Sequence, residues 1–503
     1  MHGLFGASKV WKNDRLIKCF KNENLYAVLG SAIAAFLFLF EAPVNIWKSA
    51  DVFTDAGVFK TVAMMMERGY MPYRDSFDHK GPVLYILNYF GNIIGGYRGI
   101  WVIELIFMLV SILMIYKIAR LSIGVVQSVV VTGASMTLLF SYFEGGNFTE
   151  EYAIGFIAVS QYIFLDYLLN EKITKLRLVI CGASLSAVLL LRPNMIAVWI
   201  VFALAVLYKV IKENKISDLI YFLTWFIIGI FLIMLPILVW LIYNNSLEWC
   251  WKVYIEFNTM YVSEEGGLSL FKTRWTTFLF FMDTTIFLIA TIVQVYICCK
   301  KREWVDVAYL AYMGLSLFFI CLSGLLCGHY GMVLVPVVAY PISQLFKLIK
   351  DISDKSVAEI MSLLVSLYFL GVLILPNWLY LGSTIPSVYD ARMEDQRSDV
   401  VKQIAYIIQE NTAEEDVISV YGNWGMIYVA SDRMHATRYS YQFPIGEVMP
   451  EIMDDYFEGL ESELPKIIVT QVMYHDDRMN EFLDSNGYSL CWSEKGVAAV
   501  FVR

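Results

Sequence analysis

Apolar runs of about 20 residues recur from Leu25 to Gly382, and they constrain the fold more than any other feature. A helix of that length can cross a hydrocarbon core of about 30 Å. The composition agrees, because 58% of the residues are hydrophobic and only 17% are charged. We therefore expect a polytopic α-helical membrane protein.

The last part of the chain differs from the rest in charge. From Ser383 to Arg503 there are 21 Asp or Glu against 9 Lys or Arg, a net charge of −12, whereas the whole chain carries −9. This balance indicates an acidic, soluble appendage and gives no sign of nucleic-acid binding. The appendage is expected to be a small α/β domain because helical and strand patterns alternate along it. Helices are predicted at 399–409, 446–460 and near 478–485, and strands at 417–421, 467–470 and 498–502.

Lysine and arginine in the short loops predict the orientation, because such residues stay on the cytoplasmic side. Five of them precede the first apolar run, which places the N-terminus in the cytoplasm and the C-terminal domain outside. The predicted domains are an N-terminus at 1–24, a transmembrane domain at 25–382 and a soluble domain at 383–503. About eleven spans are predicted, at 25–46, 101–118, 123–142, 150–169, 178–191, 195–210, 217–243, 274–297, 305–323, 329–346 and 357–381.

This scheme has two large outer loops, at 47–98 and 244–274. It requires the short apolar stretch Val83–Gly96 to return to the outer surface, since this stretch is nearer interfacial than spanning length. We therefore expect interfacial helices in the first outer loop. No cleavable signal peptide is evident, and the plain loops favour a bacterial source.

The first outer loop carries an unusual number of ionisable groups directly behind an apolar span. Asp55 is expected to open an amphipathic helix that lies in the membrane interface and ends before Gly69. Asp55 then has two interpretations. It either favours the helix dipole, which contributes about 0.3–1 kcal/mol, or it performs chemistry.

Lys80 precedes a second predicted helix, because Pro82 suits a first helical turn. A cation at a helix N-terminus is locally unfavourable unless an anion shares the site, and a membrane-surface phosphate is the obvious candidate. The alternative is that Lys80 reaches lipid headgroups or pairs with Asp78.

The order of residues in this loop resembles the first extracytoplasmic loop of GT-C glycosyltransferases. The matching patterns are D-x-G-x-[FY] at Asp55–Phe59, G-x-x-P-Y-x-D at Gly69–Asp75 and D-x-K-x-P at Asp78–Pro82. The resemblance is closest to the branch that contains dolichyl-phosphate-mannose protein mannosyltransferases and bacterial aminoarabinose transferases. It implies a GT-C fold, a polyprenyl-phosphate sugar donor, and inversion at the anomeric carbon with Asp55 as the base. Many relatives have Asp-Glu where this chain has Asp55-Ala56, which puts a metal-binding role for that pair in doubt.

The residues themselves agree with this chemistry. The leaving group is a phosphate, so no protonating acid is needed, but positive charge must stabilise the phosphate as the bond breaks. Lys80 is the first candidate, and Arg192 at the outer membrane edge is the second, since guanidinium binds phosphate oxygens bidentately. The alternative for Arg192 is an ion pair with an outer-loop glutamate. A pair of carboxylates that hydrolyse a glycoside is the competing chemistry, and the cations of the loop disfavour it.

Weaker candidates surround this core of the site. Asp51, Asp75 and Asp78 are expected to position the loop or the acceptor. Glu150 and Glu151 either suit a helix N-terminus or bind the acceptor. A further pair, His329 and Tyr330, begins the tenth span and could contact sugar or phosphate, although Tyr330 also fits an aromatic belt.

The sequence thus predicts a membrane glycosyltransferase that moves a sugar from a polyprenyl-phosphate carrier to a hydroxyl of a glycan, lipid or protein. The predicted partners are this donor, the acceptor and the bilayer. The sequence leaves a divalent metal open as a cofactor, but it shows no ligand cluster that would support one. The rivals are a transporter or flippase of a lipid-linked glycan, and an inactive homologue that acts in assembly.

Overall fold

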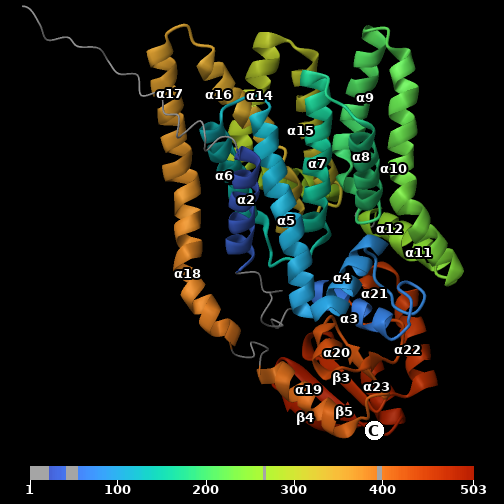
Figure 1. The fold of residues 1–503 in the computed structure, drawn as a ribbon. Helices are drawn as coiled ribbons and strands as arrows, with labels where there is room; N and C mark the ends of the chain where they lie inside the picture. Colours follow the sequence, from blue (N-terminus) through green and yellow to red (C-terminus); the bar gives the residue numbers. More distant parts are fainter. Residues whose placement is uncertain (1–21, 41–54, 264–267, 394–398) are drawn as a thin grey trace, which may run out of the picture.

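The computed structural model of the chain describes residues 22–40, 55–263, 268–393 and 399–503. Long helices stand side by side in one part of the molecule, and a small α/β domain covers one end of them (Figure 1). The elements of the helical part are α2 (Glu23–Leu39), α3 (Asp55–Glu67), α4 (Pro82–Gly95), α5 (Tyr97–Arg120), α6 (Val125–Tyr142), α7 (Thr149–Asn170), α8 (Lys175–Leu189), η1 (Pro193–Met195), α9 (Ala197–Lys212), α10 (Ile216–Tyr243), α11 (Leu247–Cys250), η2 (Trp251–Glu256), α12 (Phe257–Ser263), α13 (Leu268–Met282), α14 (Thr285–Lys301), α15 (Trp304–Cys321), η3 (Gly328–Leu334), α16 (Ala339–Lys350), α17 (Lys355–Tyr368), η4 (Phe369–Ile374) and α18 (Leu375–Met393).

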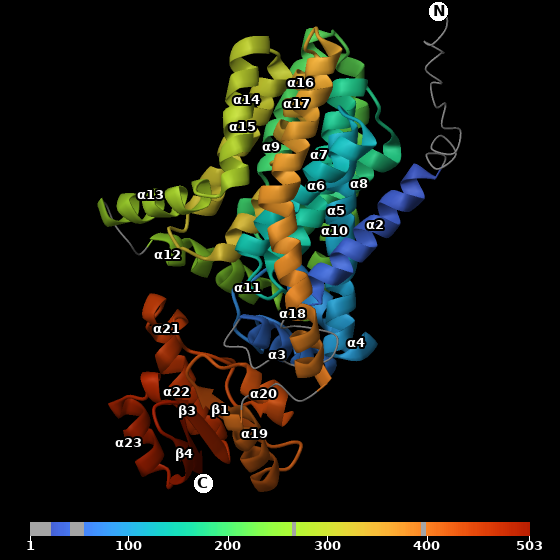
Figure 2. The same cartoon turned by 90° about the vertical axis from the view of Figure 1, so that its left-hand side faces the viewer.

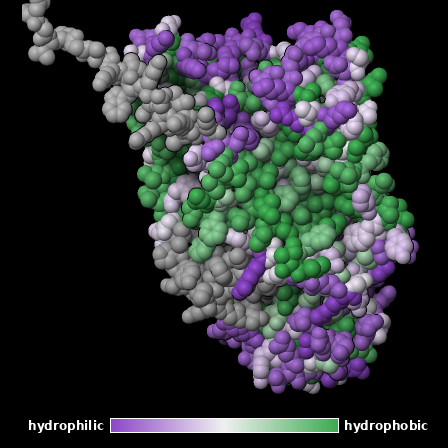
Figure 3. Space-filling model, in the orientation of Figure 1, coloured by the Kyte–Doolittle hydropathy of each residue, from purple (hydrophilic) through white to green (hydrophobic). Residues whose placement is uncertain are grey.

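The helical part is a membrane bundle. Among the described residues, six helices are long and apolar enough to cross a bilayer, or up to eight if each of two bent pairs is one span. The six are α5, α6, α7, α10, α15 and the continuous helix α17–η4–α18. Figure 3 shows the apolar band that these helices form between two polar ends of the molecule. The fold is thus polytopic and helical, while the count of eleven spans stays a prediction.

Two predicted spans are bent in the structure. The segment predicted as one span at 274–297 forms α13 and α14, which meet at 91°, and Figure 2 shows α13 projecting sideways from the bundle. Thr284 precedes α14 as its N-cap residue and has an extended backbone, so the polar pair Asp283-Thr284 interrupts an otherwise apolar run. The segment at 329–346 consists of η3 and α16, which meet at 44°.

Buried side chains satisfy the backbone carbonyls that this second bend exposes. Tyr309 donates its hydroxyl to the Val337 carbonyl at 2.7 Å, and the Gln161 amide donates to the Pro336 carbonyl at 3.0 Å. An unpaired carbonyl in an apolar interior costs several kcal/mol. The two bonds therefore stabilise the bend.

Helices α3 and α4 lie between the bundle and the C-terminal domain (Figures 1 and 2). The expectation that α3 is an amphipathic helix with one exposed polar face is wrong, because Ala56 through Met65 are all buried. One side packs on the bundle, and the other side packs on the C-terminal domain through Met64 and Met65. Thr61 donates its hydroxyl to the Gly425 carbonyl at 2.9 Å across that second contact. The C-terminal domain thus buries the face of α3 that we expected to contact lipid or water.

The C-terminal domain is a five-stranded mixed sheet with helices. Strands β1 and β3 are parallel, β2 runs parallel to β1, and the pairs β3–β5 and β4–β5 are antiparallel, in the order β2-β1-β3-β5-β4. This confirms the predicted small α/β domain. Its elements are α19 (Asp399–Asn411), β1 (Val417–Tyr421), α20 (Met426–Ser431), β2 (Met434–His435), α21 (Ile445–Val448), α22 (Glu451–Glu463), β3 (Ile467–Gln471), η5 (Val472–Tyr474), α23 (Asp477–Ser485), β4 (Ser489–Glu494) and β5 (Ala498–Val502).

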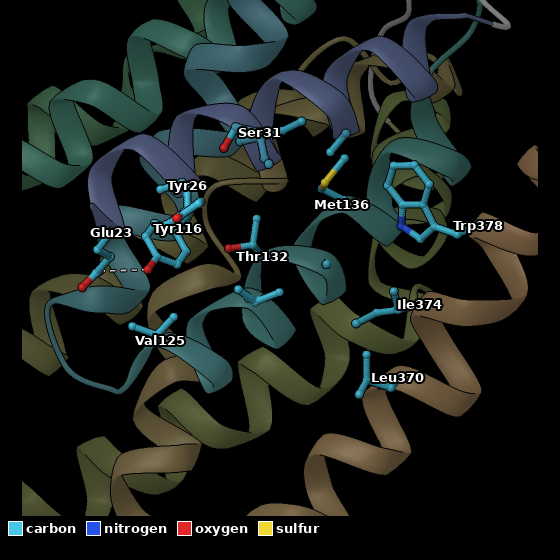
Figure 4. A pocket seen from close by; sticks show the side chains of 16 residues that line it. Glu23, Tyr26, Ser31, Tyr116, Val125, Thr132, Met136, Leu370, Ile374 and Trp378 are labelled. Carbon is cyan, nitrogen blue, oxygen red and sulfur yellow. Dashed lines mark hydrogen bonds between the residues drawn. The ribbon is translucent and has the colours of Figure 1, made fainter. Parts of the chain in front are cut away.

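A hollow of about 410 Å³ lies within the bundle, between α2, α6 and the η4–α18 helix (Figure 4). Its lining is almost wholly apolar, and its polar end is formed by Tyr116, whose hydroxyl donates to Glu23 at 2.9 Å. Its lining includes none of the predicted site residues that the structure describes. The predicted site residues that the structure describes therefore lie elsewhere in the molecule.

Candidate active site

Asp55 and Lys80 lie together in a cavity of about 280 Å³ where the bundle meets the C-terminal domain. Asp55 is the first residue of α3, and Lys80 ends the turn that leads into α4. The Lys80 Nζ atom is 3.4 Å from Asp55 Oδ2. Asp55 is about half exposed, with 47% of its side-chain surface accessible, so a ligand in the cavity can reach it.

The turn that carries Lys80 is fixed by its own polar side chains. The Asp75 carboxylate accepts from the Met71 backbone N–H at 2.7 Å and from the Arg74 guanidinium at 2.7 Å. Tyr73 adopts a positive φ of 69°, and its hydroxyl donates to the Lys80 carbonyl at 2.8 Å. These bonds hold the backbone of Lys80 in place, so its ammonium group is aimed by a rigid turn.

Gly81 brings this turn against the segment that carries Arg192. Its N–H donates to the Leu191 carbonyl at 3.3 Å, and Val83 N–H donates to the Leu190 carbonyl at 3.1 Å. A Cβ atom on Gly81 would lie 2.1 Å from the Leu190 carbonyl oxygen. The glycine is thus required by close approach, which sets Lys80 and Arg192 near each other.

Replacing Gly81 with alanine should therefore destabilise the protein by about 1–3 kcal/mol, because the added methyl group overlaps backbone. The measurement is thermal unfolding of the purified full chain. Gly314 is the matched control, since nothing lies within 4 Å of its Cβ position and it sits within a helix. Equal melting temperatures for the Gly81→Ala and Gly314→Ala variants would contradict the expected overlap.

The charges of the site hold one another in their ionised forms. Burial alone would raise the pKa of Asp55, but the groups around it, of which Lys80 has the largest effect, together lower that pKa below its ordinary value. Burial alone would lower the pKa of Lys80, but Asp55 and Asp78 raise it above the ordinary lysine value. Burial and the nearby Lys80 lower the pKa of His79, which is therefore neutral at pH 7. The cavity thus presents an ammonium–carboxylate pair beside a neutral imidazole.

A second cavity of about 350 Å³ shares the wall formed by His79, Lys80, Leu325 and Tyr330. Arg192 lines it, together with apolar side chains such as Leu322 and Ile255. The Arg192 guanidinium donates to Glu150 and lies 3.9 Å above the centre of the Tyr330 ring. The structure therefore brings both predicted cations to one cavity, and it shows the ion pair that the sequence offered as the alternative for Arg192.

The C-terminal domain completes the first cavity. Tyr441 donates its hydroxyl to Asp78 Oδ1 at 2.9 Å, while Tyr85 donates to Asp78 Oδ2 at 2.7 Å. Asn423 and Pro444 also line the cavity from this domain. Arg438 anchors the contact, because its backbone carbonyl accepts from Phe77 N–H at 2.7 Å and its guanidinium stacks 4.0 Å from the Trp249 ring.

Replacing Tyr441 with phenylalanine should lower the stability of the full chain by about 1.5–3 kcal/mol, because a buried carboxylate loses one hydrogen-bond donor. Asp78 is only 3% exposed, so water cannot replace that donor freely. The measurement is thermal unfolding, with Tyr406→Phe as the control. Tyr406 lies on the same domain with 58% of its surface exposed. A variant Tyr441→Phe as stable as the Tyr406→Phe control would show that this bond is unimportant.

The other predicted residues divide into those inside and outside the cavities. Asp78 and His329 line the first cavity, and Tyr330 lines both. Asp75 is used within its own turn and lines neither cavity. Glu150 stands behind Arg192 as its ion-pair partner.

Glu151 serves a structural contact away from the cavities. Glu151 is fully buried and lines neither of them, and its Oε2 accepts from the Asn147 N–H at 2.7 Å. It therefore stabilises the loop before α7. Asp51 lies outside the described residues.

Sequence reasoning missed the lining residues His79, Glu144 and Tyr441, whereas Asn423 belongs to the turn Tyr421–Gly425, which the sequence offered as a weak carbohydrate-contacting candidate. Glu144 accepts from the Gly328 N–H at 2.8 Å and lies 2.6 Å from His329 Nδ1. His329 in turn stacks on Phe148, with ring centres 4.3 Å apart. The position of His79 inside the loop motif was an available signal, whereas no local pattern marked Tyr441. Among the described residues, no group of three or more His, Cys, Asp or Glu side chains could hold a metal ion.

Comparison with solved structures shows that the chain has a known fold. ArnT from Cupriavidus metallidurans in the apo state aligns with a TM-score of 0.62 and 10% identity, over 95% of this chain and 98% of ArnT. ArnT bound to undecaprenyl phosphate aligns with a TM-score of 0.62 and 12% identity, over 95% of this chain and 97% of ArnT. The apo oligosaccharyltransferase of Archaeoglobus fulgidus aligns with a TM-score of 0.42 and 14% identity, over 89% of this chain and 70% of that protein. No curated protein is significantly similar in sequence.

The ArnT likeness confirms the GT-C fold that the first loop predicted. A family described as the putative competence-induced protein Ccs4 N-terminal domain matches residues 24–338. That range is more than half of the 503 residues and includes Asp55, Lys80 and Arg192. The chain therefore belongs to the family of putative competence-induced Ccs4 proteins, and its N-terminal domain has a GT-C fold.

Proposed function

We propose that the protein is a membrane glycosyltransferase that moves one sugar from a polyprenyl-phosphate carrier to an acceptor hydroxyl on a glycan, lipid or protein. The reaction takes place at the outer face of the cytoplasmic membrane and inverts the anomeric carbon. Its site is the pair of cavities joined at Lys80.

The observation that carries the proposal is the position of Lys80 on the wall between the two cavities. The second cavity is largely apolar and is bordered by Arg192, which suits the phosphate end of a long apolar carrier. The first cavity is more polar and holds Asp55, which suits a sugar and an attacking hydroxyl. A carrier phosphate at Lys80 would therefore lie between its own apolar chain and its sugar. ArnT has been solved with undecaprenyl phosphate bound, which supports a ligand of this chemistry for the shared fold.

The ion pair suggests how the base becomes active. An arriving phosphate competes with Asp55 for Lys80, and the loss of this cation removes the main influence that lowers the pKa of Asp55. The pKa of Asp55 then rises, which makes the carboxylate a stronger base for the acceptor proton. The acceptor oxygen attacks the anomeric carbon while Asp55 takes its proton. The bond from that carbon to the phosphate oxygen breaks, and the carrier leaves as a phosphate anion stabilised by Lys80.

Arg192 has a supporting role in this proposal. Its charge is already balanced by Glu150, and its guanidinium face rests on Tyr330. A paired cation can still donate from its remaining N–H groups, so Arg192 can orient a second phosphate oxygen. Lys80 contributes more to phosphate binding than Arg192, because its partner Asp55 is more exposed than Glu150 and can be displaced.

The direct test uses membranes that contain the full chain and undecaprenyl-phosphate sugars with a radiolabel in the sugar. We expect the label to leave the carrier and appear in an acceptor fraction. This transfer should occur in membranes that contain the wild-type chain and not in membranes that lack it. In parallel, the purified protein should bind undecaprenyl phosphate and not undecaprenol, which lacks the phosphate. Failure to bind undecaprenyl phosphate would exclude the proposed function.

A further inference from the structure

One polar side chain of the first cavity is left unused by the proposed reaction. Asn423 lies in the turn Tyr421–Gly425 between β1 and α20 and lines the cavity from the C-terminal domain. Its backbone N–H donates to Gln471 Oε1 at 2.6 Å. Its side-chain amide makes no hydrogen bond with any residue that the structure describes, although it carries two donors and an acceptor.

The turn is held in place so firmly that the direction of Asn423 is set by the fold. Gly422 has a φ of +150°, and a Cβ atom there would lie 2.3 Å from Gln471 Oε1, so only glycine fits. The Gly422 N–H donates to Gln442 Oε1 at 2.9 Å. Asn423 thus stands on a preorganised turn, which is the usual requirement of a recognition residue.

The same turn lies against the first part of α3. A Cβ atom on Gly425 would be 3.1 Å from the Val58 backbone nitrogen, and one on Gly57 would be 3.2 Å from the Met426 nitrogen. Glycine on both sides permits this close approach of two backbones. Because Asp55 opens α3 less than one turn before Val58, Asn423 faces the cavity from the wall adjacent to the base.

The occupant of this cavity follows from the direction of the carrier. If the carrier chain lies in the apolar second cavity and its phosphate lies at Lys80, the sugar can only project into the first cavity. The volume of about 280 Å³ is at the small end of ligand sites, which suits a single sugar ring. A carboxamide can donate to one ring hydroxyl and accept from another, so it is well matched to a sugar.

We propose that Asn423 is a specificity-determining residue that binds hydroxyl groups of the transferred sugar. The C-terminal domain therefore supplies sugar recognition, while the membrane domain supplies the base and the phosphate ligand. This inference rests on the proposed function and assigns the sugar subsite of the same cavity.

The test compares sugar-bearing and bare carriers. The purified full chain and the Asn423→Ala variant are titrated with undecaprenyl phosphate and with undecaprenyl-phosphate glucose, galactose and N-acetylglucosamine. We expect the wild-type protein to bind at least one sugar-bearing carrier more tightly than the bare carrier. The variant should lose about fivefold in affinity for that ligand, as expected for one or two hydrogen bonds, and keep its affinity for bare undecaprenyl phosphate.

Asn480→Ala is the matched control, since Asn480 is an exposed asparagine of the same domain that lines neither cavity. It should bind all four ligands as the wild type does. Unchanged sugar affinity in the Asn423→Ala variant would overturn the inference and leave the proposed function intact. An equal loss for bare and sugar-bearing carriers would also overturn it, because the effect would then be structural. Absence of all carrier binding in the wild type would instead refute the proposed function itself.

Discussion

Replacing Asp55 with asparagine should reduce sugar transfer by a factor of roughly 10²–10⁴, the range expected when a general base is removed. The amide has nearly the same shape as the carboxylate and cannot take the acceptor proton. Binding of undecaprenyl phosphate should persist or tighten, because Lys80 no longer has Asp55 as a competing partner. The measurements are release of radiolabelled sugar from the carrier in membranes and carrier affinity of the purified chain.

The matched control for this variant is Asp432→Asn. Asp432 also forms an ion pair across the two domains, with Arg68 at 2.7 Å, but it lies away from both cavities. This control should transfer sugar normally. Near-normal turnover in the Asp55→Asn variant would remove Asp55 from the role of base and leave the cavity without an assigned one.

The parts of the site that sequence could predict are those encoded within a short stretch of chain. Asp55, Asp78 and Lys80 lie within one loop, and the residues between them fix their arrangement through local bonds such as Tyr73 to the Lys80 carbonyl. Turn and helix-start signals in such a loop are readable because they depend on neighbours in sequence. The small α/β domain was predictable for the same reason, since strand and helix periodicities are local.

The parts that escaped prediction depend on contacts between distant segments. Tyr441 reaches Asp78 across 363 positions of sequence, and no periodicity marks such a contact. The burial of both faces of α3 likewise requires the C-terminal domain, which is absent from any local pattern. The strand β4 was missed because it is an exposed edge strand, so it lacks the alternation of apolar and polar residues that reveals half-buried strands.

The segment at 274–297, expected as one straight helix, is bent in the structure for a different reason. The expectation depends on apolar length alone, and the polar pair Asp283-Thr284 lies inside that run. The structure uses this pair to end one helix and begin another at 91°. Apolar length shows that a segment can cross a bilayer, but it does not reveal a break between two helices within the segment.

Replacing Lys80 with alanine should weaken the binding of undecaprenyl phosphate by about 10- to 100-fold, because a hydrogen bond to a charged group contributes about 1.5–3 kcal/mol. Arg192 remains in the second cavity, so binding should be reduced and not abolished. The measurement is titration of the purified chain with undecaprenyl phosphate. Lys252→Ala is the control, since Lys252 also pairs with a carboxylate, Glu248 at 2.8 Å, yet lines neither cavity.

The Asp55→Asn and Lys80→Ala variants should differ in which step they impair as well as in the size of the effect. This difference separates the roles of Asp55 and Lys80. Loss of Asp55 should stop transfer while the carrier still binds, whereas loss of Lys80 should lower binding first and transfer as a consequence. Without Lys80, Asp55 loses the strongest of the influences that lower its pKa, so this pKa rises. Transfer by the Lys80→Ala variant should therefore fall more steeply as the pH is lowered than transfer by the wild type. Unchanged carrier affinity in that variant would show that the phosphate lies elsewhere, and the division of the site into two cavities at Lys80 would then have no function.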